Sequence, residues 1–396
     1  MNILIVCQYY YPENFQINDI SAELVRRGHK VMVLTGLPNY PEGIVPEAYR
    51  HGKRRDEVIN GVRVLRCFEI GRKKGIVGLT LNYLSYAVSA WVNASQLKEK
   101  FDVVYVYQLS PVLMAIPAIR YKKRFKVPLV LYCNDIWPES MKLLIRNEKS
   151  LPFKIIRFIS KKIYNSCDKL LLQTSYFIPY FEDVHKISRD KIAVIPQFAA
   201  DDYLQENFFT DNGVIDFVFL GNIGIAQNLL AVLKAVKQNQ DLTNIKLHIV
   251  GDGSCLSNLK NFVAENKLEK IVQFYGRRPL DEMPIFYRLA DVCIVSLKNN
   301  NLTGLTLPGK VQGYMAAGKM ILGMIDGAAS EVIKNSDCGF CADADDVDGF
   351  AEFMRKIVVE KLDCRKYGEN GRNFFKKHFT RNQHIDLLEN ILREII

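Results

Sequence analysis

The sequence predicts an α/β fold made of two Rossmann-like, doubly wound domains that face each other across a cleft. At 396 residues the chain is too long for one ordinary hydrophobic core. Short apolar runs alternate with helical patterns, which is typical of a parallel sheet covered on both faces. This alternation begins a second time at "VIDFVFLGN", residues 214–222. In such sheets ligands bind beyond the carboxyl ends of the strands, so the loops that follow the strands are the candidate sites.

In the first half, a helix is expected at about residues 18–27, closed by Gly28. The apolar runs predict strands at 3–9, 30–35, 61–68, 101–108, 127–135, 169–174 and 192–198. In the second half, helices at about 226–237 and 281–289 separate further strands. Those strands are predicted at 214–222, 245–253, 271–276, 291–297 and 320–325.

Three segments follow from this pattern: an N-terminal Rossmann-like domain at 1–200, a C-terminal Rossmann-like domain at 201–378 and a terminal helix at 379–396. A polar, acidic stretch at 199–212 is the expected hinge. The terminal helix places Ile385, Leu388, Leu392 and Ile395 on one face, so we expect it to pack back toward the N-terminal domain.

Composition indicates an ordinary globular protein, with 48% apolar and 24% charged residues. The start has no basic segment and only a short apolar run, so no signal peptide is expected and the chain is read as reduced and cytoplasmic. Cys338 and Cys341 lack a second cysteine pair and are interpreted as structural, since neither zinc nor redox chemistry fits them.

The basic excess lies entirely in the first half. Residues 1–198 hold 30 Lys and Arg against 17 Asp and Glu, whereas the remainder holds 23 against 26. Residues 75–97 carry no charge, and polar residues recur there every three or four positions, which favours a helix packed in the domain or lying against lipid over a membrane span. Basic clusters at 72–74, 120–124 and 154–164 then predict a peripheral association with an anionic membrane surface, although any one cluster could be a solvated helix face. Nucleic acid fits less well, because no recognition motif accompanies the charge.

Two glycine turns and one lysine are the strongest candidate donor-side features. Gly221, Asn222 and Gly224 lie between a strand and a helix, where backbone N–H groups can approach a phosphate. Gly251 and Gly253 follow the next strand; either turn could also be a simple strand end. Lys310 stands at the start of a helix that Pro308 can begin. The charge of Lys310 and the positive end of the helix dipole then lie together, which is unfavourable unless an anion binds there. A solvent-facing Lys310 is the alternative.

In the first domain, polar residues follow three strands. "CNDIWPES" at 133–140 contributes Asp135 and Glu139, which suit a hydroxyl-rich ligand but could equally be a helix cap or a salt-bridge partner. The loops at 9–19 and 35–43 add Asn14 and Asn39 as candidate acceptor contacts.

These pieces resemble a known family. "QYYYPEN", "RRGHKVMVLTGLPNYPEG", "DIWPES", "LGNIG", "VGDG" and "LPGKVQGYMAAGK" span nearly the whole chain in one order. In this the sequence resembles the retaining glycosyltransferases of family 4, which have the GT-B fold. More narrowly it is similar to the bacterial capsule and O-antigen subgroup termed N-acetyl-L-fucosaminyltransferase-like.

The resemblance implies a nucleotide-diphospho-sugar donor on the C-terminal domain, UDP-linked by family habit, an acceptor on the N-terminal domain, and transfer with retained anomeric configuration. A lipid-linked saccharide is the expected acceptor, and neither a metal nor a further cofactor is expected. Lys310 matches the family's phosphate-binding lysine, and Asp135 occupies the region of a donor-side histidine. The loop at 221–224 carries no cation, so its backbone amides, or the more distant Arg277 or Arg278, are expected to compensate. The rest of the expected donor site comprises Leu305, Thr306 and Gly309. The family's paired glutamates are absent, since their positions read Leu305 and Gly313.

Three other readings are weaker. A non-hydrolysing nucleotide-sugar epimerase would need carboxylates and a histidine in the donor cleft, but His248 is predicted within a strand. A Rossmann dehydrogenase would need the complete glycine fingerprint. A two-lobed sugar-binding protein would normally be exported.

Overall fold

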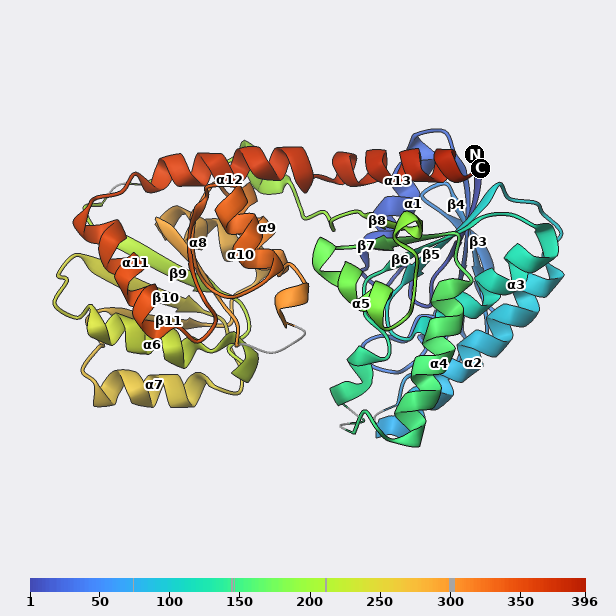
Figure 1. The fold of residues 1–396 in the computed structure, drawn as a ribbon, viewed down its shortest axis with the longest axis horizontal. Coiled ribbons are helices and arrows are strands. Elements are labelled where there is room, and N and C mark those ends of the chain that lie inside the picture. The colour runs from blue at the N-terminus through green and yellow to red at the C-terminus, as the bar shows by residue number, and fades with distance from the viewer. Residues whose placement is uncertain (74, 144, 146, 211, 299–302) are drawn as a thin grey trace. The chain divides into compact units, whose positions relative to one another are not determined.

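The computed structural model describes residues 1–73, 75–143, 145, 147–210, 212–298 and 303–396. They form two compact units, of which the first comprises Met1–Ile195 with Ile385–Ile396 and the second Pro196–His384. Figure 1 shows the course of the chain through both units. Lys74 of the predicted basic cluster and Asp211 of the predicted hinge lie outside the described residues.

The N-terminal unit contains an eight-stranded sheet in the order β3-β4-β2-β1-β5-β6-β7-β8. Its strands are β1 Asn2–Val6, β2 Lys30–Thr35, β3 Asp56–Ile59, β4 Val62–Arg66, β5 Val103–Gln108, β6 Leu129–Cys133, β7 Lys169–Leu172 and β8 Ile192–Val194. Its helices are α1 Gln16–Arg26, α2 Gly75–Gln96, α3 Ile116–Phe125, α4 Leu151–Asn165 and α5 Ile178–Asp183. The order reverses between β1 and β5, so the loops after these two strands diverge at the switch point where such folds bind ligands.

The C-terminal unit contains a six-stranded parallel sheet in the order β11-β10-β9-β12-β13-β14. Its strands are β9 Ile215–Leu220, β10 Ile245–Val250, β11 Val272–Gly276, β12 Val292–Ser296, β13 Met320–Met324 and β14 Gly339–Ala342. Its helices are α6 Leu229–Gln238, α7 Leu256–Glu265, α8 Met283–Leu289, α9 Gly309–Ala316, α10 Ala328–Asn335, α11 Val347–Val359 and α12 Cys364–His378. This is the strand order of a dinucleotide-binding fold, with its switch point between β9 and β12.

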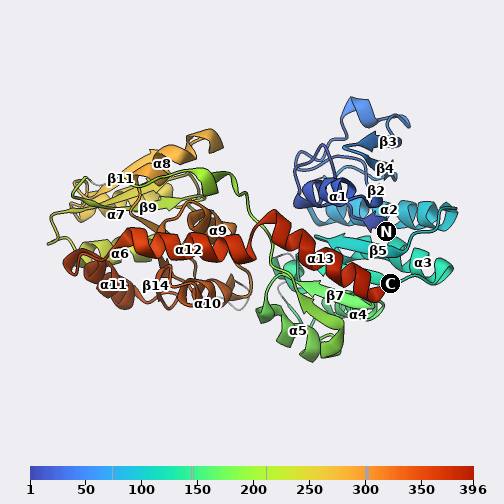
Figure 2. The same cartoon turned by 90° about the horizontal axis from the view of Figure 1, so that it is seen from above.

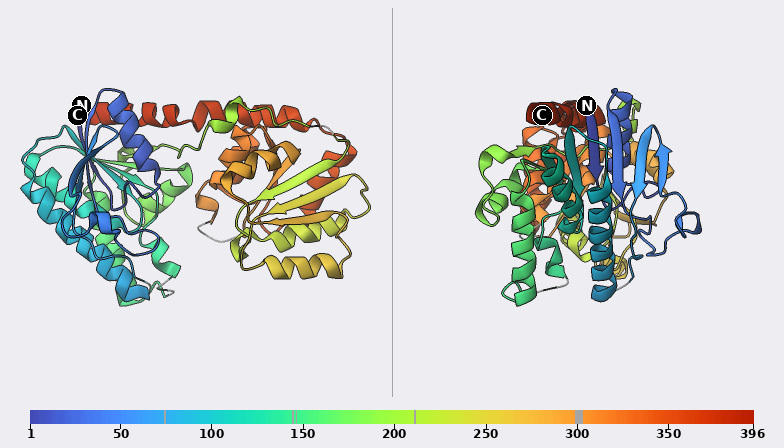
Figure 3. Two further views of the ribbon diagram at one scale, coloured as in Figure 1. Left: turned by 180° about the vertical axis from the view of Figure 1, so that it is seen from behind. Right: turned by 90° about the vertical axis from the view of Figure 1, so that its right-hand side faces the viewer.

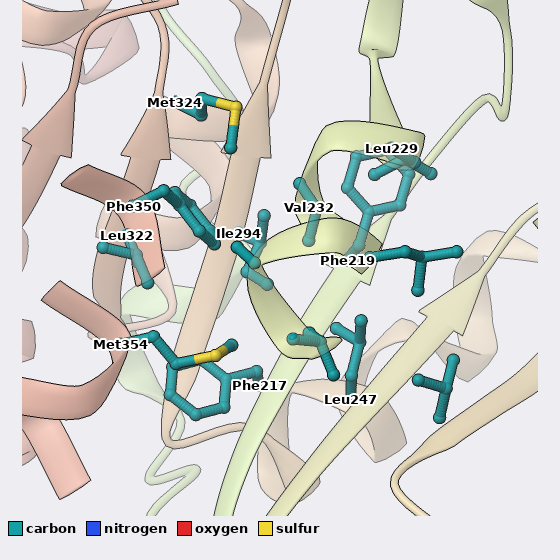
Figure 4. Packing of buried hydrophobic residues seen from close by; sticks show 14 of the residues in the cluster. Phe217, Phe219, Leu229, Val232, Leu247, Ile294, Leu322, Met324, Phe350 and Met354 are labelled. Atoms are coloured by element: carbon teal, nitrogen blue, oxygen red, sulfur yellow. The ribbon is translucent and has the colours of Figure 1, made fainter. Parts of the chain in front are cut away.

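Both faces of the C-terminal sheet are buried. Strand β9 shows this, since its successive side chains point to opposite faces. Phe217 and Phe219 pack with α6, α7 and α11. Figure 4 shows this cluster with Val232 of α6 and Met354 of α11. Val218 and Leu220 pack with α8, α9, α10 and α12 on the other side. Each unit is therefore a doubly wound α/β domain, which confirms the predicted fold class.

The terminal helix α13, Arg381–Ile395, buries Ile385, Leu388 and Leu392 completely. Its residues from Ile385 onward belong to the N-terminal unit, where Arg27 forms an ion pair of 3.2 Å with Glu389. Figure 2 shows the helix running over that unit's strands. The unit division falls at residues 195 and 196, before the stretch at 199–212.

Two strands were missed by the sequence analysis. Strand β3 pairs antiparallel with β4 at the sheet edge, where "DEVI" is too polar to read as a buried strand. Strand β14 is only four residues long and begins at Gly339. The predicted first strand was too long, because Cys7 to Tyr9 are buried although they have left the sheet.

Candidate active site

Helix α9 brings Lys310 to the end of β9. The ammonium nitrogen lies 4.0 Å from the centroid of the Phe219 ring. A Cβ atom built on Gly221 would stand 3.0 Å from the same nitrogen. One helical turn further, on the same face, the Tyr314 hydroxyl accepts a hydrogen bond of 3.2 Å from the Leu220 N–H. Tyr314 thus fixes the helix against the strand, and Lys310 is held beside the glycine turn that follows it.

The charge on Lys310 is poorly compensated. Among the described residues its ammonium group forms neither a hydrogen bond nor an ion pair, and the face of the Phe219 ring is its main partner. Burial lowers the pKa of Lys310 to about 8, because a desolvated ammonium favours its neutral form. An anion placed next to it would restore the charged form. The position thus suits a cation that waits for an anionic ligand.

The glycine turns after β9 and β10 pack against each other backbone to backbone. Gly221 and Gly251 have φ angles of 139° and 142°, which side chains disfavour. A Cβ on Gly251 would come within 1.8 Å of the Gly221 carbonyl oxygen, and one on Gly253 within 2.4 Å of the Ile223 carbonyl oxygen. These glycines are therefore required for the close approach of the two loops.

Most amides of the turn at residues 221–224 are already hydrogen-bonded. Gly221 N–H donates to Val250 O at 2.9 Å and Ile223 N–H to Asp252 O at 2.8 Å. The Gly224 N–H donates to the Gln227 side-chain oxygen at 3.1 Å. Within the described part of the chain, the backbone N–H of Asn222 is the only one in this turn without an acceptor; the Asn222 side-chain amide donates to Gln227. The turn therefore offers a phosphate fewer donors than its sequence suggests, which places more of the task on side-chain cations.

A groove of about 1260 Å³ opens beside these turns. It is lined by Gly221, Asn222, Val250, Gly251, Asp252, Gly253, Arg277, Arg278, Pro279, Leu280 and Met283. Arg277 is exposed, and it has no partner within the described residues. Arg278 donates to Tyr275 O at 3.2 Å and lies 3.6 Å from the Glu282 carboxylate. Arg277 is therefore the arginine that remains available to a ligand.

The other donor-side candidates lie around the segment between β12 and α9. Leu305 ends the short helix η9, Thr303–Leu305, and Leu305 and Thr306 are half-buried. Gly309 is exposed at the start of α9, with open space where a Cβ would stand. At Gly313, where the family has a glutamate, a Cβ would contact only the Tyr287 hydroxyl, at 3.3 Å. In the described part of the chain, none of these residues is among those that line the groove.

In the N-terminal unit, Asp135 is engaged through both carboxylate oxygens. Ser110 donates its hydroxyl to one oxygen, and Ser140 donates to the other at 2.6 Å. Trp137 in turn donates its indole N–H to the Ser110 hydroxyl at 2.9 Å. The observed role of Asp135 is to tie together the loops after β5 and β6.

Glu139 is buried and serves a charge network. It accepts a hydrogen bond of 2.8 Å from the Tyr180 hydroxyl and forms an ion pair with Lys142. Arg157 lies 3.9 Å from its carboxylate, and Lys142 also pairs with Glu148 at 2.7 Å. These contacts agree with the alternative interpretation from the sequence, in which Glu139 is a salt-bridge partner.

Asn39 is buried, whereas Asn14 is exposed in the loop after β1. The Asn39 side-chain amide donates to Glu69 Oε1 at 2.6 Å and its carbonyl oxygen accepts the Arg72 N–H at 2.9 Å. Glu69 Oε1 also accepts from Asn82 at 2.6 Å, and burial raises the pKa of Glu69 to about 8. The sequence analysis missed Glu69, because nothing in "RCFEI" distinguishes it from a surface glutamate.

Two smaller expectations concern histidine and cysteine. His248 lies within β10, as predicted, and contacts Asp216 at 2.7 Å. Cys338 is buried, and burial raises its pKa to about 12. Within the described residues no group of three or more His, Cys, Asp or Glu side chains is arranged to hold a metal ion.

The fold has solved counterparts. Over 100% of both chains, the structure is similar to the crystal structure of Anabaena HepE in complex with UDP, with a TM-score of 0.70 and 12% sequence identity. Two doubly wound domains that follow one another along the chain are typical of the GT-B glycosyltransferase fold. The chain therefore has the GT-B fold.

The particular families follow from the sequence. Residues 15–201 match Glycosyltransferase Family 4, and residues 204–374 match Glycosyl transferases group 1. The chain is thus a glycosyltransferase that consists of a family 4 domain followed by a group 1 domain.

Two relatives come from Escherichia coli. The putative colanic acid biosynthesis glycosyl transferase WcaI is 23% identical over 344 residues, 80% of this chain and 82% of that protein. The O-antigen chain mannosyltransferase C is 21% identical over 409 residues, 100% of this chain and 99% of that protein.

Proposed function

We propose that the protein transfers a hexose from a nucleotide-diphospho-sugar to a lipid-linked glycan during synthesis of a bacterial surface polysaccharide such as capsule or O-antigen. The donor is proposed to be of the UDP-N-acetylhexosamine type, the anomeric configuration to be retained, and the reaction to need no metal. The two relatives named for colanic acid and O-antigen support the pathway class. The observation that carries the proposal is the uncompensated ammonium of Lys310 beside the Gly221 turn.

The chemistry follows from where charge develops. As the bond between the anomeric carbon and the phosphate oxygen lengthens, negative charge grows on the leaving diphosphate. A fixed ammonium in a desolvated position stabilises that charge more than it stabilises the bound donor. Lys310 meets both conditions, since Tyr314 fixes its helix and burial removes its water. Arg277 on the groove wall supplies the second cation, and the backbone N–H of Asn222 supplies a neutral hydrogen-bond donor.

Retention without a protein nucleophile fits a front-face reaction. In this scheme the acceptor hydroxyl attacks from the side on which the diphosphate departs, and the diphosphate oxygen takes the proton. Asp135 then acts by positioning Trp137 and the Ser110 loop, because both of its carboxylate oxygens already accept hydrogen bonds. Lys310 and Arg277 hold the diphosphate where it can accept the proton.

The proposed place of action is the cytoplasmic face of the membrane, where the acceptor is anchored. Helix α2 turns its polar stripe inward: Asn82 is fully buried and donates to Ile70 O at 2.7 Å. Its apolar stripe is exposed through Val77, Leu81, Leu84, Val88, Trp91 and Val92. The inward face also buries Tyr83, Tyr86, Ala87, Ala90 and Ala94, so the helix carries apolar side chains on both faces. Among the helices described, α2 alone is long and apolar enough to cross a membrane, by length and composition.

Helix α4 adds the basic component. Leu151, Ile155 and Phe158 are exposed beside the exposed Lys154 and Lys161. Figure 3 shows α2 and α4 along the same side of the N-terminal unit. Exposed apolar side chains flanked by lysines suit an anionic lipid surface.

The basic cluster at 120–124 is largely engaged within the protein, which narrows the lipid-binding surface to α2 and α4. Arg120 donates to the Ser95 hydroxyl at 2.9 Å, Arg124 to Leu97 O at 2.8 Å, and Lys122 pairs with Asp168 at 2.6 Å.

A direct assay tests the proposed function. The purified protein is incubated with radiolabelled UDP- and GDP-sugars and with lipid-linked acceptors, with and without EDTA. We expect transfer from a UDP-N-acetylhexosamine, unaffected by EDTA, into a product whose anomeric signal matches that of the donor. Transfer from GDP-mannose would favour the second candidate, a mannosyltransferase, which the O-antigen relative's name supports. Free nucleotide-sugar conversion without an acceptor would contradict both.

Trp91 allows a test of membrane binding. The two tryptophans differ in exposure, with Trp91 43% and Trp137 4% exposed. Vesicles that contain anionic lipid should shift the emission of wild-type protein to shorter wavelength, whereas Trp91→Phe should show no shift and still sediment with the vesicles. An emission spectrum unchanged by anionic vesicles, together with protein that stays in the supernatant, would contradict the lipid-binding surface.

A further inference from the structure

The C-terminal unit contains a second cavity, of about 130 Å³. It lies at the amino ends of the strands, whereas the groove lies at their carboxyl ends. Its wall includes Asp291 and Lys319, which precede β12 and β13, whereas the groove follows β9, β10 and β11. The lining is Asn207, Phe208, Phe209, Asp291, Ala317, Gly318, Lys319, Cys364, Arg365, Glu369 and Arg372. Nothing in the proposed transfer reaction uses this cavity.

Lys319 is a buried cation held only by neutral groups. Its side chain is buried, and its ammonium group donates to the carbonyl oxygens of Phe208 at 2.8 Å and Ala290 at 2.6 Å. Burial lowers the pKa of Lys319; Cys293 and Asp291 oppose this shift, and Arg372 acts in the same direction as burial. An ammonium group has three hydrogens, so these two acceptors leave one donor position.

Arg372 approaches the same cavity from α12. One terminal nitrogen donates to Glu206 O at 2.9 Å and Ala317 O at 3.0 Å. Its Nε atom is buried, and no acceptor for it lies among the described residues. Gly318 makes this position possible, since a Cβ there would stand 2.9 Å from the guanidinium. Burial lowers the pKa of Arg372 as well.

The two acids on the wall oppose these shifts only in part. Asp291 accepts a hydrogen bond of 2.9 Å from the Asp216 N–H, and Glu369 pairs with Arg365 at 3.3 Å. Asp291 acts to raise the pKa of Lys319 and Glu369 that of Arg372, but burial outweighs both acids. In the described part of the chain neither Lys319 nor Arg372 forms a direct ion pair, so an anion in contact with both would stabilise their charged forms.

We propose that this cavity binds a small phosphate-class oxyanion through Arg372 and Lys319. The volume is several times the roughly 30 Å³ that one water occupies in the liquid, so a tetrahedral oxyanion fits. One terminal nitrogen of Arg372 already donates to two carbonyl oxygens, so the buried Nε–H and the other terminal nitrogen are the donors left for oxyanion oxygens. The ligand is either free phosphate or the phosphate group of a small metabolite, and the site is separate from the donor groove.

Isothermal titration with inorganic phosphate at constant ionic strength tests the proposal. Wild-type protein should bind phosphate saturably. Arg372→Gln should weaken binding about tenfold to a hundredfold, because a charge-assisted pair of hydrogen bonds is lost. Lys310→Met, which changes a residue beside the Gly221 turn and outside the lining of this cavity, should leave this binding unchanged. A parallel titration with a sugar phosphate distinguishes the two ligand sources: tighter binding of the ester assigns a metabolite, equal binding assigns free phosphate.

Two further variants keep the test decisive if Arg372→Gln lowers stability. Arg365→Glu reverses an exposed charge on the cavity wall and should weaken phosphate binding several-fold. Arg355→Glu, an exposed arginine paired with Asp241 on another helix, is the matched control and should have no effect. Absence of saturable binding to the wild type, or binding that Lys310→Met abolishes and Arg365→Glu leaves intact, would overturn the proposal.

Discussion

The two units present their predicted polar residues in opposite ways. In the C-terminal unit, Lys310 and Arg277 have no ionic partner among the described residues, and the glycine turns beside them line an open groove. In the N-terminal unit, Asp135, Glu139 and Asn39 are each engaged in several hydrogen bonds or ion pairs. Both sets follow strands, and the sequence offers both as candidate site residues. A polar residue at a strand end is therefore a ligand contact only when the fold leaves its polar atoms without a partner.

The largest expected effect is that of Lys310→Met. Loss of the cation should lower turnover by a hundredfold or more, which is the usual result when one fixed donor to a developing charge is removed. Transfer rates at saturating donor measure this. Lys260→Met is the matched control, because Lys260 also lies over a phenylalanine ring, Phe274 at 6.0 Å, on the exposed surface. Equal activity of the two variants would remove the basis of the site.

The same substitution should raise thermal stability at neutral pH. The folded-state pKa of Lys310, about 8, lies below its ordinary value of 10.5, so the protonated lysine opposes folding below pH 8. That opposition fades as the pH rises from 8 toward 10.5. Replacement by Met should then stabilise the protein by about 1–3 kcal/mol at pH 7 and by little at pH 10. Melting curves at both pH values measure the difference, and a lower melting temperature at pH 7 would contradict the uncompensated charge.

Arg277 and Arg278 sharpen the comparison within the groove. Arg277→Gln should raise the KM for the donor about tenfold, since its guanidinium is free to bind a phosphate. Arg278→Gln should change it about twofold, because Glu282 and Tyr275 already engage that side chain. Steady-state kinetics separate the two, and a reversed order would assign the phosphate contact to Arg278.

Asp135 and Glu139 test the other half of the comparison. Asp135→Ala leaves two serine hydroxyls without their acceptor, and Glu139→Ala leaves Lys142 and Arg157 without a buried partner. Each should cost about 2 kcal/mol of folding free energy. Turnover of the folded fraction should fall less than tenfold. A large loss of turnover with an unchanged melting temperature would restore Asp135 to a direct catalytic role.

Tyr314→Phe should give the smallest effect. It removes one hydrogen bond, to the Leu220 N–H, worth about 1 kcal/mol. Because this bond holds α9 against β9, we expect a several-fold drop in turnover with an unchanged KM for the acceptor. A change in acceptor KM alone would contradict a role in positioning Lys310.

Much of the C-terminal site could be predicted because its parts lie at strand ends in a regular fold. Gly221 follows β9 and Lys310 lies in the first turn of the helix after β12, and the switch point brings neighbouring strands β9 and β12 together. The state of the turn amides could not be predicted, since two of their acceptors, Val250 and Asp252, belong to β10 and the loop after it. The network around Glu69 was out of reach for a similar reason: Gln8, Asn39 and Asn82 meet it from distant segments.

The most direct test of the central claim is the number of protons taken up when UDP binds at pH 8. Free Lys310 is about half protonated there, and contact with a diphosphate should raise its pKa and complete the protonation. Calorimetric titration in buffers of different ionisation enthalpy should show uptake of about half a proton by the wild type and none by Lys310→Met. Equal uptake by both proteins would show that the diphosphate does not contact Lys310.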